Sequence, residues 1–172
     1  MVIVCLKRTL KFSMIRPTKP EDAAALIAVA NAIGFEPKEL DDLGKMLADY
    51  LGGNSNSDSD RFWITDDDDS DGVVGVAYCE PERMTDQTWN LQLIAIRPDR
   101  QGQGRGGKLL RYVEETLKVR GGRMLLVETL ASFERTRTFY AKCGYEEEAR
   151  IRDFYTVGAD KIVFRKVLNS AG

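Results

Sequence analysis

IRPDRQGQGRGGKLL, at residues 96–110, concentrates four glycines immediately before a predicted helix. Glycine allows a ligand to approach the backbone closely, and the N-terminus of a helix carries partial positive charge. Both features favour an anion, so we expect this loop to bind a pyrophosphate.

Two nucleotide-binding motifs fit part of this loop. Residues 102–108 have the glycine and lysine spacing of a P-loop, but Leu109 stands where a serine or threonine must hold magnesium, which argues against a nucleotide triphosphatase. The same glycines match the dinucleotide fingerprint, and Glu128 follows at about the distance of its ribose-binding acid. Residues 97–101 separate the preceding strand from the first glycine, however, which argues against a dinucleotide-binding oxidoreductase.

Hydrophobic periodicity on both sides of the loop predicts an α+β fold with a mixed sheet. The predicted strands cover residues 13–17, 61–65, 73–78, 89–96, 124–129, 146–152 and 161–167. The predicted helices cover residues 20–33, 38–51, 104–120 and 133–142. The three strands directly before the loop form an antiparallel meander, whereas the loop helix connects two parallel strands. The acidic residues 66–71 are assigned to a solvated hairpin turn.

Length and composition predict a single domain. With 172 residues and 43% hydrophobic content, the chain has material for one well-buried core, which we assign to residues 13–172. Residues 1–12 are interpreted as an extension, because their basic residues follow the apolar part, the reverse of a secretory signal. Three cysteines without a CxxC spacing indicate a reducing compartment, so we place the protein in the cytoplasm.

Several partners and chemistries are disfavoured by the composition. A net charge of −2 gives no basic footprint for nucleic acid or a membrane surface, and no apolar run approaches the roughly 18 residues that span a bilayer. The chain has no histidine, which removes nucleophile–histidine pairs and histidine–metal sites. Asp67, Asp69 and Asp71 begin like a calcium loop, but its last ligand position is Tyr78 instead of glutamate, and we predict no metal.

A third interpretation of the loop rests on a different spacing. Residues 101–106 have the pattern Gln-x-x-Gly-x-Gly, which resembles the pyrophosphate loop of the GNAT superfamily of acyl-CoA-dependent N-acetyltransferases. Farther along, RTFYAKCGY at residues 137–145 resembles the Phe-Tyr-x-Lys-x-Gly-Phe stretch of the same family. Two motifs in order, with a strand between them, are more specific than either one alone. The resemblance in layout covers roughly residues 13–168 and is strongest over residues 89–145.

The resemblance implies both a fold and a cofactor. The expected sheet is mixed, mainly antiparallel and flanked by helices, with its central strands splayed apart. Acetyl-CoA is the expected co-substrate: the splayed strand bonds its pantetheine arm and the loop wraps its pyrophosphate, with the side chains of Arg105 and Lys108 available to the charge. The residues implied to bind it are Ile94, Ala95, Ile96, Gln101, Gly102, Gln103, Gly104, Arg105, Gly106 and Gly107.

The resemblance also implies that Tyr140 is a catalytic acid. It matches the family tyrosine that protonates the departing thiolate of coenzyme A, and a phenol with an ordinary pKa of about 10 is a competent acid for that step. The alternative is a core aromatic residue beside Phe139. Phe133 departs from the family, which often has an asparagine there to bond the pantetheine arm, so that contact must be absent or replaced.

An amine acceptor must also lose a proton, and without histidine a carboxylate or water is the expected acceptor of that proton. Glu80, Glu82 and Glu128 lie near the ends of predicted strands, and Glu82 is our choice, although each also fits a solvated surface residue. The hypothesis is direct acetyl transfer, in a ternary complex, to a primary amine on a small molecule or a peptide. A non-catalytic acyl-CoA sensor is the alternative. The sequence leaves open which amine is acetylated and whether the protein forms a homodimer.

Overall fold

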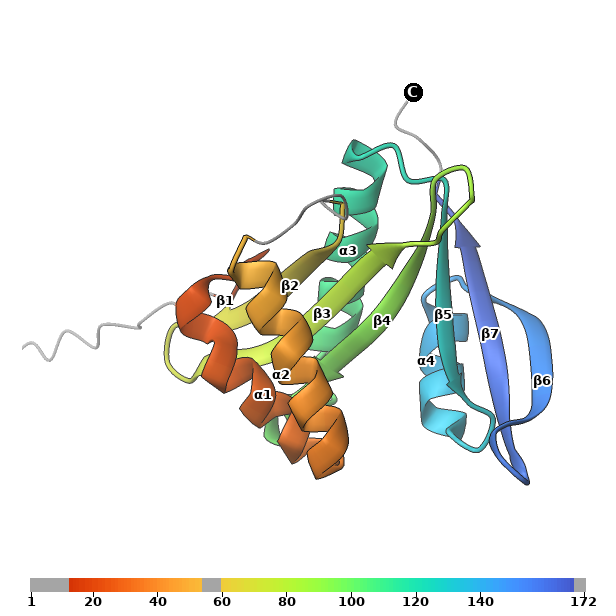
Figure 1. The fold of residues 1–172 in the computed structure, drawn as a ribbon, viewed down its shortest axis with the longest axis horizontal. Helices are drawn as coiled ribbons and strands as arrows, with labels where there is room; N and C mark the ends of the chain where they lie inside the picture. The colour runs from red at the N-terminus through yellow and green to blue at the C-terminus, as the bar shows by residue number, and fades with distance from the viewer. Residues whose placement is uncertain (1–12, 54–59, 169–172) are drawn as a thin grey trace, which may run out of the picture.

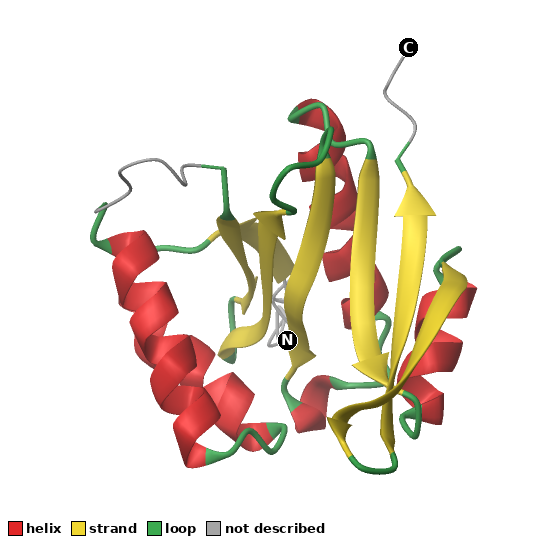
Figure 2. Cartoon of the chain, turned by 45° about the vertical axis from the view of Figure 1, so that its right-hand side comes forward, coloured by secondary structure: helices red, strands yellow, loops and turns green. Residues whose placement is uncertain are grey.

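The computed structural model describes residues 13–53 and 60–168, so the predicted extension, residues 1–12, lies outside the described part. Its centre is a seven-stranded sheet in the order β1-β2-β3-β4-β5-β7-β6 (Figure 1, Figure 2). The strands are β1 (Ser13–Pro17), β2 (Phe62–Asp68), β3 (Gly72–Pro81), β4 (Thr88–Ile96), β5 (Met124–Leu130), β6 (Glu146–Thr156) and β7 (Ala159–Val167). All neighbouring strands are antiparallel except β4 and β5, which are parallel. The predicted α+β class with a mixed sheet is confirmed.

Helices cover both faces of the sheet (Figure 1). They are α1 (Ala23–Ala32), α2 (Pro37–Leu51), α3 (Arg105–Val119) and α4 (Glu134–Lys142), with short 3-10 turns η1 (Pro20–Asp22) and η2 (Pro98–Arg100). α1 and α2 pack on one face, over a core that includes Trp63, Tyr78 and Leu93. α3 and α4 pack on the other face, where Leu109 and Leu117 are buried as their helical spacing predicts. None of the helices in residues 13–53 and 60–168 has the length and apolar character that crossing a membrane requires.

β2 extends farther than its sequence predicts. The prediction ended this strand at Thr65 and placed the following aspartates in a solvated turn, but Asp66 and Asp68 lie within the strand and are buried. The turn consists of residues 69–71 only. The assignment of residues 66–68 to solvent is therefore wrong, and the reason is tertiary: Arg105, at the start of α3, binds both buried carboxylates.

The hydrogen-bonded pairing between the central strands β4 and β5 ends partway along both strands. They pair from Thr88 opposite Met124 to Leu91 opposite Val127, and no pairing continues beyond that point in the described register. A bulge lies at the same place, because Leu91 and Leu93 of β4 face consecutive residues of β3 and Gln92 is the extra residue. Bulges bend a strand and increase its twist, which carries the end of β4 away from β5. The predicted splay of the central strands is confirmed.

Buried tyrosines predict how the stability of the fold depends on pH. Burial raises the pKa of Tyr140 and Tyr145, so the folded chain retains phenol protons that the unfolded chain releases near pH 10. Their contribution to stability is therefore complete below about pH 10 and declines as the pH rises past it. Chemical denaturation of the wild type and a Tyr140→Phe variant measures this, since the variant lacks one such phenol. We expect the difference in unfolding free energy to be constant up to about pH 10 and then to shift in favour of the variant; a constant difference throughout would contradict the assignment.

Candidate active site

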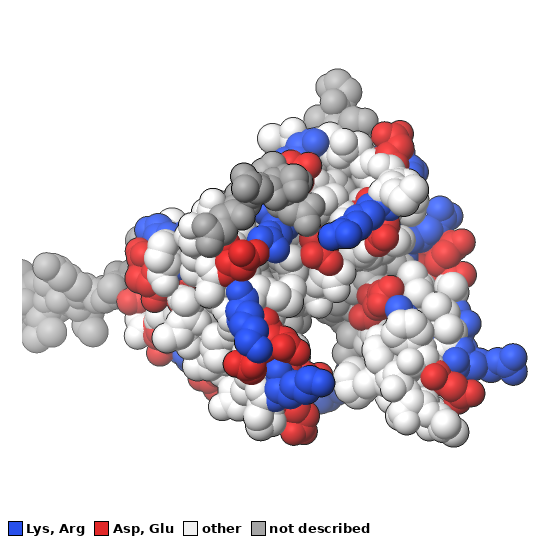
Figure 3. All heavy atoms as spheres, in the orientation of Figure 1, with Lys and Arg blue, Asp and Glu red and all other residues white. Residues whose placement is uncertain are grey.

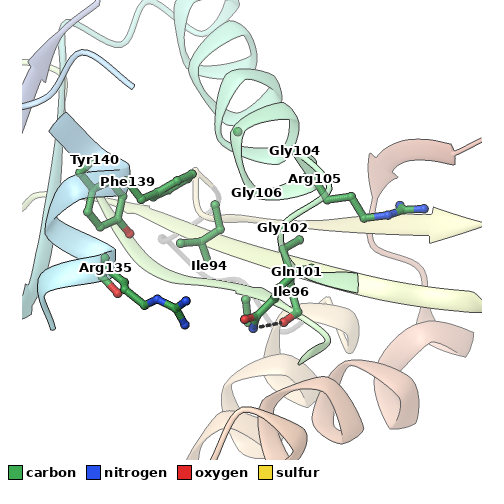
Figure 4. Close-up of a pocket in the computed structure, with 13 residues that line it drawn as sticks. Ile94, Ile96, Gln101, Gly102, Gly104, Arg105, Gly106, Arg135, Phe139 and Tyr140 are labelled. Atoms are coloured by element: carbon green, nitrogen blue, oxygen red, sulfur yellow. Dashed lines mark hydrogen bonds between the residues drawn. The ribbon is translucent and has the colours of Figure 1, made fainter. Parts of the chain in front are cut away.

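A cavity of about 380 Å³ lies where β4 leaves β5 (Figure 4), a volume typical of small-molecule sites. Three elements form its walls: the end of β4, the glycine loop with the first turn of α3, and one face of α4. The lining residues are Ile94, Ala95, Ile96, Gln101, Gly102, Gly104, Arg105, Gly106, Gly107, Arg135, Thr136, Phe139 and Tyr140. The structure thus brings together the residues expected to bind a cofactor, except that Gln103 is not among the lining residues.

The unpaired end of β4 directs backbone groups into the gap. The Arg97 N–H donates to the Val74 carbonyl oxygen of β3 at 2.8 Å. Because successive residues of a strand direct their backbone groups to opposite sides, those of Ala95 face β3, whereas those of Ile94 and Ile96 face the gap. Ile94 therefore offers a main-chain donor and acceptor to an extended ligand, whereas Ile96 offers its N–H, since the Gln101 side chain bonds its carbonyl oxygen.

The glycine loop presents free amide groups to the cavity. Gly102 and Gly104 have left-handed φ values of 73° and 76°, a conformation that favours glycine, and Gly104 caps α3. Lys108 is the first helical residue whose N–H bonds a carbonyl, that of Gly104, at 3.1 Å. The N–H groups of residues 105–107 have no acceptor among the described residues, as expected for the first turn of a helix. Free amides at the start of a helix are the arrangement that the sequence predicts for an anion site.

Two loop side chains hold the loop in place through polar contacts with the protein. The Gln101 Nε2 donates to the Ile96 carbonyl oxygen at 2.9 Å, which fastens the loop to β4 (dashed line, Figure 4). The Arg105 side chain points away from the cavity, and its guanidinium binds Asp66 and Asp68 of β2 (Figure 4). The prediction that the Arg105 side chain is available to a pyrophosphate is therefore wrong, whereas its backbone N–H remains at the cavity.

Tyr140 occupies the opposite wall of the cavity. Its side chain lies on α4, its ring packs against Phe139, Tyr145 and Phe164, and only 3% of the residue is exposed. The hydroxyl group points toward the gap beside Ile94 (Figure 4) and has no hydrogen-bond partner among the described residues. Burial raises the pKa of this phenol, so the expectation of an ordinary pKa is wrong. Tyr140 therefore keeps its proton at physiological pH, and its hydroxyl is free to donate a hydrogen bond into the gap.

The sequence interpretation missed three residues of α4 that line the cavity, Arg135, Thr136 and Phe139. Arg135 and Thr136 lie one helical turn before Phe139 and Tyr140, so all four residues occupy one face of α4. That spacing was a usable signal, because Tyr140 alone already fixes which face meets the cavity. Arg135 reaches toward the loop (Figure 4) and has no ion-pair partner within residues 13–53 and 60–168. Its charge is available to an anion in the cavity.

The structure does not bring Glu82 to Tyr140. Glu82 lines a separate hollow of about 340 Å³ with Glu80 and Asn90, and its carboxylate accepts a hydrogen bond from the Asn90 amide. This hollow shares no lining residue with the cavity at the splay. Asn90 also precedes Ile94 by four positions of β4, about 13 Å along a strand. Glu82 is thus poorly placed to take a proton from a nucleophile at the splay.

Glu128 lies at the point where the strands separate. It directly follows Val127, the last residue of β5 that pairs with β4. Val127 faces the core under α3 and α4, so the alternation of a strand directs Glu128 to the opposite face of the sheet. Its side chain is 45% exposed, and a carboxylate oxygen lies 2.7 Å from the Lys161 Nζ. Of the three candidate carboxylates, Glu128 is the one beside the splay.

The sequence matches the family model described as "Acetyltransferase (GNAT) domain" over residues 58–147. The chain belongs to the GNAT family of acetyltransferases. It is accordingly an acyltransferase, and the matched segment contains the glycine loop, the splay and Tyr140. The dinucleotide-binding alternative is excluded, since the strand before the loop belongs to an antiparallel meander and the loop is reached through η2.

The chain is also similar to individual acetyltransferases. A structure assigned to the GNAT acetyltransferases, from Desulfovibrio desulfuricans, is 30% identical, with a TM-score of 0.85 over 92% of this chain and 100% of that one. N-alpha-acetyltransferase 30 from Schizosaccharomyces pombe is 28% identical over 102 residues, which is 58% of this chain and 67% of the relative. An acetyltransferase structure from Salmonella typhimurium, with its cofactor acetyl-CoA, has the same fold, with a TM-score of 0.72 at 17% identity over 94% of this chain and 96% of that one.

A substitution at Gly107 tests the anion site without straining the fold. A Cβ added there meets no atom within 4 Å, and the position lies in the first turn of α3, where a carboxylate is favourable to the helix. Gly107→Glu therefore keeps the fold but places negative charge at the cavity, and we expect acetyl-CoA to bind at least about tenfold more weakly. Gly107→Ala is the matched control and keeps the affinity. Calorimetric titration measures both, and equal affinities would argue against phosphate binding at this turn.

Proposed function

We propose that this GNAT protein transfers an acetyl group from acetyl-CoA directly to a primary amine, in a ternary complex. The observation that carries the proposal is one continuous cavity with three functions on its walls. Main-chain groups of Ile94 and Ile96 face the pantetheine position, the first-turn amides of α3 face the pyrophosphate position, and the Tyr140 hydroxyl faces the gap between them. The acetyl-CoA present in the Salmonella typhimurium structure supports the choice of cofactor.

The acceptor reaches the thioester from the other face of the sheet. The cofactor cavity lies on the side of α3 and α4, whereas the face of α1 and α2 is hollowed between those helices and the part that bears β6 and β7 (Figure 3). Two reactants held on opposite sides of the splay meet in the plane of the sheet. Holding them in attack geometry supplies much of the rate enhancement of such a transfer.

Tyr140 completes the departure of coenzyme A. The amine nitrogen attacks the thioester carbonyl carbon, the carbon–sulfur bond breaks, and the sulfur takes up the phenol proton. Because burial raises the pKa of Tyr140, its proton is held until negative charge develops on the sulfur, and the hydroxyl first stabilises that charge as a hydrogen-bond donor. The phenolate then regains a proton from solvent or from the acetylated amine.

We propose that Glu128, and not Glu82, accepts the proton of the amine. The support is positional: Glu128 begins the splayed part of β5 and faces the side from which the amine arrives. Lys161 orients the carboxylate through its 2.7 Å contact, and the Glu128 side chain is exposed enough to meet an arriving ammonium group. Because the Schizosaccharomyces pombe relative is named an N-alpha-acetyltransferase, we would test α-amino groups of peptides first as acceptors.

Tyr140→Phe tests the transfer step. Removing the hydroxyl leaves the ring and its packing in place, so acetyl-CoA affinity is expected to stay the same while kcat falls by about 10²-fold or more. The measurement is thioester consumption with a panel of peptide and small-molecule amines, beside calorimetric titration with acetyl-CoA. Unchanged turnover would remove the acid role from Tyr140. Failure of the wild type to bind acetyl-CoA would refute the proposed function itself.

Glu128→Gln tests the proton acceptor, with Glu82→Gln as the matched control. We expect kcat/KM at neutral pH to fall by about 10²-fold in the Glu128 variant and to stay unchanged in the control. The loss shrinks as the pH rises, because more of the amine then arrives already deprotonated. A fall in kcat/KM that does not depend on pH would show that Glu128 has only a structural role. A fall in the Glu82 variant alone would identify Glu82 as the proton acceptor.

A further inference from the structure

We propose that the acidic β2–β3 hairpin positions the pyrophosphate loop, through ion pairs to arginines that the loop directs away from its ligand. We call Asp66, Asp68 and Asp71 the hairpin clamp. The inference rests on the proposed binding of acetyl-CoA and assigns a part to residues that the expected reaction does not use. The clamp residues are positioning residues, since they act on the ligand through the loop.

The strongest contact of the clamp holds the first residue of α3. The Arg105 guanidinium lies 2.9 Å and 3.0 Å from the two carboxylate oxygens of Asp66, and it also binds Asp68. These side chains are 11%, 1% and 5% exposed for Arg105, Asp66 and Asp68. The Ser13 hydroxyl joins the cluster, 3.0 Å from Arg105 and 2.8 Å from Asp66. A buried cluster of this kind fixes geometry, because moving either partner leaves a charge without compensation.

Two further contacts hold the other end of the loop to the same hairpin. Arg100, in η2, forms an ion pair with the Asp71 carboxylate. The Arg97 side chain donates to the Asp71 backbone carbonyl oxygen at 3.3 Å, and its backbone N–H donates to Val74 at 2.8 Å. The loop is therefore held to β2 and β3 before and after the segment 101–104, whose glycines face the cavity.

The direction of these arginines separates two kinds of anion site. Cationic side chains that bind a phosphate directly would point into the cavity, as Arg135 does (Figure 4). Arg97, Arg100 and Arg105 instead have carboxylate partners outside it. The loop offers its ligand the backbone amides of the first turn of α3. The direction of these N–H groups depends on how the backbone of the loop is held. A loop held in its binding conformation before the ligand arrives binds more tightly.

The sign of one substitution distinguishes this proposal from simple electrostatics. Removing an acidic charge near a diphosphate site favours anion binding if the charge acts only through its field, and it would also release Arg105 toward the ligand. If the clamp positions the loop, the same substitution weakens binding, since the loop then spends only part of its time in the competent conformation. A tenth of the time in that conformation corresponds to about a tenfold higher Kd.

The test compares Asp68→Asn and Asp71→Asn with Asp69→Asn. Asp69 lies in the same hairpin, is exposed and has no hydrogen bond or ion pair with the described residues, so its substitution removes the same charge without touching the loop. We expect KM and Kd for acetyl-CoA to rise about tenfold in the two clamp variants, with kcat retained, and to stay unchanged or fall in the control. Asp71 lies in a turn, so its variant keeps the test available if Asp68→Asn fails to fold.

Acetyl-pantetheine, a donor without the diphosphate, completes the test. The clamp acts on the pyrophosphate loop alone. The KM for acetyl-pantetheine is therefore expected to be the same in all variants. Equal or tighter acetyl-CoA binding in the clamp variants would overturn the proposal, as would an equal rise in KM for acetyl-pantetheine, which would indicate general damage. Failure of the wild type to bind acetyl-CoA would instead refute the proposed function, so the two failures are distinguishable.

Discussion

The interrupted pairing of β4 and β5 creates the cavity that the glycine loop and α4 surround. Backbone donors and acceptors in the interior of a protein need partners, and a sheet normally supplies them from the adjacent strand. Beyond the pair formed by Leu91 and Val127, β4 has a neighbour on one side only. The backbone groups of Ile94 and the Ile96 N–H therefore lack a strand partner at the gap, which α3 and α4 flank, while the Ile96 carbonyl is bonded by Gln101.

Charge is divided between the two sides of the glycine loop. On the inner side, the loop offers neutral amide groups and the partial positive charge of a helix terminus. On the outer side, Arg100 and Arg105 are neutralised by aspartates of the β2–β3 hairpin. This division keeps the guanidinium groups of Arg100 and Arg105 out of the cavity, whereas Arg135 faces it from the opposite wall.

Much of the fold could be predicted from local pattern, and the failures share a cause. The helical face of α3 and the glycine loop are properties of short segments, which sequence periodicity and turn chemistry report directly. The burial of Asp66 could not be predicted, because its partner Arg105 lies far along the chain and the aspartate run alone indicates a solvated turn. The raised pKa of Tyr140 depends on its burial, which includes packing against Phe164 of β7, and the misplacement of Glu82 depends on strand register. Apart from Arg135 and Thr136, which helical spacing could have indicated, these errors concern contacts between different elements.

The bulge at Gln92 gives the gap a simple structural origin. β4 carries one more residue than β3 needs over this stretch, so Leu91 and Leu93 pack on opposite faces of the sheet although β3 sets them against consecutive positions. A strand without this surplus would lack the local bend that carries β4 away from β5. The opening at the centre of the sheet thus begins at a single surplus residue of one strand.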